Sequence, residues 1–130
     1  RASDQKVIST FKSHLSIIVS AKFSHDGSHV MTTSMDGTSW YWNTETAEEV
    51  RRLTSDREQY EVADLSADGK YFLTLNNTGT IKVRSLKNGK IIQEIPSINN
   101  MHFEMVRYSG DGKYLVVKTW TAVIIFEKTS

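Results

Sequence analysis

The chain has 130 residues, with 16 basic and 15 acidic side chains, a formal net charge of +1 and no cysteine. This composition excludes disulfides and thiolate metal sites, and so balanced a charge gives no overall field that would attract nucleic acid or an anionic membrane. No apolar run is long enough to span a membrane and no secretion signal is visible, so we expect one intracellular domain, or part of one, in the cytoplasm or nucleus.

The first half of the chain predicts a series of short strands separated by tight turns. Residues 6–11 form a strand-like apolar run, and the next such segment ends in the turn Asp26-Gly27. Asp-Gly between apolar runs is a strong hairpin signal, and strands rich in β-branched and aromatic residues follow it. The strands expected after this turn, with further turns at 35–37 and 44–47 between them, cover residues 30–33, 39–42 and 49–53.

The same series then recurs along the chain. The glycines of the Asp-Gly turns, Gly27, Gly69 and Gly112, are 42 and then 43 residues apart. A fixed step of roughly 20 to 50 residues marks a repeat architecture, in which each unit stacks on its neighbours. The strands expected in the later repeats are residues 71–75, 81–84, 91–95, 114–117 and 123–126. The pattern predicts an all-β fold of blades with four antiparallel strands, in three repeats at approximately 7–43, 49–85 and 91–127.

The first repeat resembles the WD40 family. Residues 11–14, Phe-Lys-Ser-His, stand where that family has Gly-His, and residues 34–43 stand where it has Ser-x-Asp-Gly-Thr followed by Trp-Asp. The resemblance implies blades of a β-propeller and a hydrogen-bonded network inside a blade. Its members here would be His14, either Thr33 or Ser34, Asp36 and Trp42. A buried carboxylate beside a histidine needs such donors.

The later repeats depart from the family motif, so we expect their blades to hold by apolar packing. Three sets of residues occupy equivalent positions and are expected in the core. They are Ile18, Tyr60 and Phe103; Phe23, Leu65 and Tyr108; and Tyr41, Val83 and Ile125.

Three repeats are too few to close a propeller, which typically needs 4 to 8 blades. One interpretation is that the chain is part of a larger propeller, with residues 6–11 as the last strand of the preceding blade. The other is a homodimer, in which residues 6–11 of each copy complete the open blade of its partner. The first is favoured, because exposed edge strands on an isolated three-blade piece would invite pairing.

Catalytic chemistry has little support in the sequence. The four histidines lack metal-binding spacing, no glycine-rich phosphate loop is present, and we expect neither a cofactor nor a metal. Ser34, His14 and Asp36 could be written as a triad, but the resemblance places them inside a blade. The alternative that stays open is a metal-dependent hydrolase or lactonase of the propeller type, whose site would begin with Glu61, His102 and Glu104. A third interpretation is a structural assembly module.

Recognition of a protein or peptide is the function we expect. In WD40 proteins the usual contact surface is a ring around the narrow mouth of the central channel. Carried over by position, the ring residues are Ile17, Val19, Met35, Gln59, Glu61, Asn77, His102, Glu104 and Trp120. Trp120 suits a binding hot spot, and Glu61 with Glu104 would favour a lysine or arginine from the partner. A basic stretch around repeat 2 is largely cancelled by its acidic neighbours, so specific nucleic-acid binding is not expected.

Overall fold

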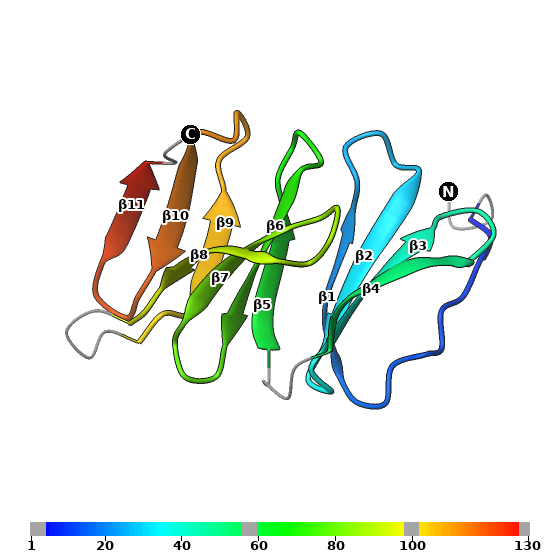
Figure 1. Ribbon diagram of the computed structural model, residues 1–130, viewed down its shortest axis with the longest axis horizontal. Coiled ribbons are helices and arrows are strands. Elements are labelled where there is room, and N and C mark those ends of the chain that lie inside the picture. The colour runs from blue at the N-terminus through cyan, green and yellow to red at the C-terminus, as the bar shows by residue number, and fades with distance from the viewer. Residues whose placement is uncertain (1–4, 56–59, 98–101, 128–130) are drawn as a thin grey trace.

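The computed structural model describes residues 5–55, 60–97 and 102–127, and within them the chain forms eleven β-strands and no helix. Three antiparallel sheets follow one another from right to left in Figure 1. The first contains β1 (Ile18–Phe23), β2 (His29–Ser34), β3 (Thr38–Asn43) and β4 (Glu49–Ser55). The second contains β5 (Tyr60–Leu65), β6 (Tyr71–Asn76), β7 (Ile81–Ser85) and β8 (Ile91–Ile95). The third contains β9 (Met105–Tyr108), β10 (Tyr114–Lys118) and β11 (Val123–Glu127).

Each sheet is a meander in which every strand pairs with the next strand of the chain. The first strands of the three sheets lie beside one another, because β5 contacts both β1 and β9. We call these three strands the inner strands. The prediction of all-β blades is confirmed, with four strands in the first two sheets and three described strands in the third.

The turn between the first two strands has the same construction in every blade. The serine before the Asp-Gly pair donates its hydroxyl to the aspartate, at 2.8 Å from Ser24 to Asp26, and the equivalent bonds in the later blades are 2.7 and 2.6 Å. Gly27 adopts a φ of 75°, a left-handed conformation that glycine reaches without steric cost. This local chemistry explains why the Asp-Gly spacing locates the blades.

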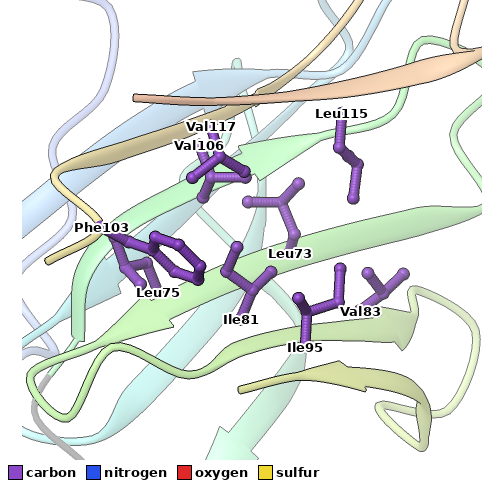
Figure 2. Packing of buried hydrophobic residues seen from close by; sticks show 9 residues of the cluster. All are labelled: Leu73, Leu75, Ile81, Val83, Ile95, Phe103, Val106, Leu115 and Val117. Atoms are coloured by element: carbon purple, nitrogen blue, oxygen red, sulfur yellow. The ribbon is translucent and has the colours of Figure 1, made fainter. Parts of the chain in front are cut away.

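The core lies between the sheets, because each blade buries one face against the next. Phe72 of β6 faces the first blade, where it packs with Met31 and Leu53. Its neighbour Leu73 points the other way, as strand alternation requires, into the contact with the third blade. Figure 2 shows this second cluster, formed by Leu73, Leu75, Ile81, Val83 and Ile95 of the second blade with Phe103, Val106, Leu115 and Val117 of the third.

Three residues expected in the core are exposed, and a common reason explains two of them. Leu65 and Tyr108 pack against the preceding blade, whereas Phe23 is 65% exposed on the outward face of the first blade, which no further blade covers among the described residues. Val83 likewise faces the third blade, whereas Ile125 is 63% exposed on that blade's far face. Burial at these positions therefore depends on an adjacent blade. Ile18 is also exposed, at the start of β1.

Residues 6–11 carry no strand pairing in this structure. Phe11 stacks on Trp42 with ring centroids 4.6 Å apart, and Ser9 donates its hydroxyl to the Thr44 carbonyl at 2.6 Å. The segment thus lies against the outward face of the first blade. Its expected role as the last strand of a preceding or partner blade needs a further blade, which the described part of the chain does not contain, and it stays a prediction.

Candidate functional site

A buried polar network joins the segment before β1 to β2 and β3. The His14 side chain is 3% exposed, and its Nδ1 lies 3.3 Å from Oδ2 of Asp36 in the β2–β3 turn. Its Nε2 lies 2.7 Å from the Thr32 hydroxyl, which also accepts the indole N–H of Trp42 at 2.8 Å. Every member of the network is held by another, so it fixes the first blade internally.

The Asp36 carboxylate is kept ionised by its hydrogen bonds. Burial of the carboxyl works against the charge, but donation from the Thr38 hydroxyl, the Leu15 and Thr38 backbone N–H groups and His14 outweighs it. These bonds lower the pKa of Asp36 from 3.8 to about 2. At neutral pH the carboxylate is a fixed acceptor that organises the turn and the segment before β1.

The hydroxyl at the centre of this network is Thr32, and neither Thr33 nor Ser34 takes that place. Thr33 lies on the opposite face of β2, where its hydroxyl is 3.1 Å from that of Ser39. Ser34 accepts the backbone N–H of Asp36 at 3.1 Å, so it supports the turn. Because side chains alternate along a strand, Thr32 shares the face of Trp42 and Thr33 cannot. Among the described residues Ser34 is not paired with His14, because the hydroxyls beside the imidazole are those of Thr32 and Thr38.

The expected ring residues come together in pairs at the ends of the strands. The Met35 N–H donates to the Ile17 carbonyl at 2.9 Å, which joins the β2–β3 turn to the start of β1. In the third blade, the rings of His102 and Trp120 have centroids 5.1 Å apart. Asn77 is exposed in the equivalent turn of the second blade and Val19 is half-buried on β1. Gln59 and the side chain of Glu61 lie outside the described residues.

Trp120 is the most prominent side chain of this surface. It lies in the β10–β11 turn and is 75% exposed, which is unusual for an indole. Glu104 below it accepts the Lys118 ammonium at 2.5 Å. The Lys118 hydrogen bond is the main reason that the pKa of Glu104 is lowered, and the nearby His102 and Trp120 add to it. The sequence analysis missed Lys118, which reaches Glu104 only through the β9–β10 register.

A hollow of about 430 Å³ runs along the inner strands near this surface. Val62 of β5 and Met105 of β9 contribute apolar lining, and Glu104 lines the hollow as well. The sequence analysis did not single out its two further cations, Lys22 of β1 and Arg107 of β9. They occupy the same position in their repeats, four residues before the turn aspartates at 26 and 111.

Three arginines of the basic stretch around repeat 2 have partners within the protein. Arg51 donates to the carbonyls of Leu86, at 3.0 Å, and Lys87 across the contact between the first two blades. Arg52 lies over the Trp40 ring, 5.6 Å from its centroid, and Arg84 is buried. Arg51 thus ties the first two blades together, whereas Arg52 and Arg84 are engaged within their own blades.

The part of the chain that the structure describes contains no cluster of side chains that could bind a metal ion. No three histidine or carboxylate side chains gather there as a metal site. Of the trio considered for a propeller hydrolase, Glu104 is engaged by Lys118. Among the described residues there is also no helix that could cross a membrane.

Comparisons with known proteins agree with this geometry. Residues 5–43 match the family model described as WD domain, G-beta repeat. The chain is also similar to the crystal structure of the C-terminal WD40 domain of Sif2, with 20% sequence identity and a TM-score of 0.75. That similarity covers 92% of this chain and 36% of the other, so the chain spans about a third of that domain. No curated protein matches the chain. The fold is therefore that of part of a WD40 β-propeller.

Proposed function

On the premise that residues 5–43 form a WD40 repeat and the chain has a WD40 β-propeller fold, we propose a non-catalytic scaffold that binds a protein or peptide. Rigid blades with exposed loops at their ends suit display of a recognition surface. The proposed setting is intracellular, in the cytoplasm or nucleus. The proposed contact residues are those of the ring: Ile17, Val19, Met35, Gln59, Glu61, Asn77, His102, Glu104 and Trp120.

The observation that carries the proposal is the exposed indole of Trp120. Its side chain is 75% exposed, yet it is placed by His102 and lies beside the Glu104–Lys118 pair. Tryptophan in a fixed position supplies a large contact area at small entropic cost and is enriched in binding hot spots. A structural role for Trp120 would instead require burial against a neighbouring part of the chain.

Site-specific photocrosslinking tests the proposal. A photoreactive amino acid replaces Trp120 at one end of the third blade or Gly110 at its other end, where a side chain meets nothing within 4 Å. We expect a discrete protein adduct from position 120 and none from position 110. Equal labelling at both positions, or an adduct from position 110 alone, would place the contact elsewhere.

A second candidate role is assembly through the far face of the third blade. Val123 and Ile125 are exposed on this face, and β11 has no outer strand among the described residues. A further blade would bury these side chains, whether it comes from a larger propeller or a second copy. The solution mass of the 130-residue chain distinguishes the two. A dimer that Ile125→Asp dissociates favours the second copy, and a monomer favours the larger propeller.

A further inference from the structure

The inner strands carry one charged residue at an equivalent position in each repeat. Lys22 of β1, Asp64 of β5 and Arg107 of β9 each lie four residues before the aspartate of their Asp-Gly turn. The three inner strands lie side by side and form one wall of the structure, so these charged residues lie on adjacent strands of that wall. The sign alternates from positive to negative to positive along that wall.

The two carboxylates described near this wall are already engaged. Asp64 accepts the backbone N–H of Tyr108 at 2.9 Å, which ties the second blade to the third. Glu104 accepts the ammonium of Lys118 at 2.5 Å. A carboxylate that receives a charged or backbone donor has less to offer an incoming cation, because the existing donor must first be displaced.

The two cations, in contrast, have no such partners. Within the described ranges, neither Lys22 nor Arg107 makes a side-chain hydrogen bond or an ion pair. Both line the hollow of about 430 Å³, together with Val62 and Met105 of the inner strands and with Glu104, whose carboxylate accepts Lys118. The hollow thus combines apolar lining with two cations from different blades.

We propose that the segment this surface recognises is an acidic peptide, whose carboxylates meet Lys22 and Arg107 while its apolar side chains lie on Val62 and Met105. This inference rests on the proposed scaffold function and specifies its partner. Arginine pairs with carboxylates in a bidentate geometry, and complementary charges raise the rate and specificity of association. It differs from the expectation that Glu61 and Glu104 attract a basic partner, which stays a prediction; of these two carboxylates, Glu104 already accepts the Lys118 ammonium.

A peptide fits these observations better than a nucleic acid. The net charge of the chain is only +1, Arg51 donates across the contact between the first two blades, and Arg52 lies over the Trp40 ring. Nucleic-acid surfaces need a run of cations along a backbone, whereas this hollow offers two beside apolar side chains.

Titration of the 130-residue chain with hexaglutamate, hexalysine and a six-nucleotide oligothymidylate, followed by amide NMR shifts, tests the proposal. Hexaglutamate should shift β1 and β9 and bind more weakly at about 0.15 M salt than at lower salt, as screening requires. The variant Lys22→Gln/Arg107→Gln should lose roughly tenfold in affinity or more. The control Lys12→Gln/Lys113→Gln removes the same charge from two exposed lysines outside the hollow and should lose less than about twofold.

Two further variants sharpen the test. Arg107→Lys keeps the charge and should retain part of the affinity. Glu104→Gln releases Lys118 and should strengthen hexaglutamate binding severalfold.

Equal losses in the two double variants, preference for hexalysine, equal binding of the oligonucleotide through the same residues, or no hexaglutamate binding would each overturn the inference. If hexaglutamate fails while the position-120 adduct persists, the inference falls and the scaffold function stands. If hexaglutamate binds and the adduct is absent, binding of an acidic peptide at Lys22 and Arg107 is supported, and recognition through the ring residues is not.

Discussion

The indole N–H of Trp42 donates to the same Thr32 hydroxyl that lies 2.7 Å from Nε2 of His14. With the proton of His14 on Nδ1, the three hydrogen bonds of the network all point in the same direction. Trp42 donates to Thr32, Thr32 to His14, and His14 to Asp36. The groups joined by these bonds are buried or half-buried, so a substitution in the network leaves a buried neighbour without its partner.

Trp42→Ala should destabilise the protein by about 3 to 5 kcal/mol, because it removes a buried aromatic and leaves the Thr32 hydroxyl with one partner fewer. Urea denaturation measures the change. Trp120→Ala is the matched control and should cost less than about 0.5 kcal/mol, since its indole is exposed. A loss below about 1 kcal/mol for Trp42→Ala would contradict its place in the network.

Thr32→Val tests the central hydroxyl at nearly constant volume. We expect a loss of about 1 to 3 kcal/mol in unfolding free energy, because the Trp42 indole N–H and the His14 ring nitrogen lose their partner. Thr46→Val, in the exposed β3–β4 turn, makes the same chemical change and should stay within about 0.5 kcal/mol. Equal effects would show that the hydroxyl does not bridge the two rings.

The Asp36 carboxylate predicts a pH dependence of stability. Its pKa is lowered from 3.8 to about 2 in the folded chain, so its contribution is fully present above the unfolded value. That contribution is lost as the pH falls through this interval, because the unfolded state binds the proton first. Thermal denaturation between these pH values should therefore show the wild type losing more stability than Asp36→Asn. Parallel curves for both proteins would rule out this role.

Gly89 in the turn before β8 carries a steric constraint from the first blade. A β-carbon at this position would lie 2.3 Å from the carbonyl oxygen of Leu53, whereas at Gly69 it would meet nothing within 4 Å. Both glycines have a positive φ, so Ala costs about 1 to 2 kcal/mol at either one. Gly89→Ala should cost about 1 to 3 kcal/mol more than Gly69→Ala, measured by urea denaturation. Equal costs would mean that the blades are farther apart there.

The strands were predictable because their turns have local chemistry. Ser24, Asp26 and Gly27 close a hairpin through contacts within a few residues, and the same triplet recurs at each turn. Burial was less predictable, since Phe23 and Ile125 match buried residues in sequence but face no blade here. The sequence alone did not identify Thr32 as the hydroxyl of the network, because that choice depends on which residues of β2 face Trp42. Thr32 and Thr33 lie on opposite faces of the strand.

The candidate surface was harder to predict, because its contacts join residues that are far apart in the sequence. Lys118 is distant from Glu104 in the chain and reaches it only through strand pairing. The Glu104 carboxylate, which we expected to attract a basic partner, is therefore already paired with a cation of the chain. Lys22 and Arg107 share a hollow because three repeats place their inner strands together. No local motif marks either relationship.

The scaffold function is tested most directly by calorimetry, in which the partner protein identified by crosslinking at position 120 is titrated into this chain. The titration compares the wild type with Trp120→Ala and with His25→Ala, which changes an exposed turn at the other end of the blades. We predict a loss of roughly tenfold or more for Trp120→Ala and less than about twofold for His25→Ala. Unchanged affinity in Trp120→Ala with a large loss in His25→Ala would contradict recognition through this surface.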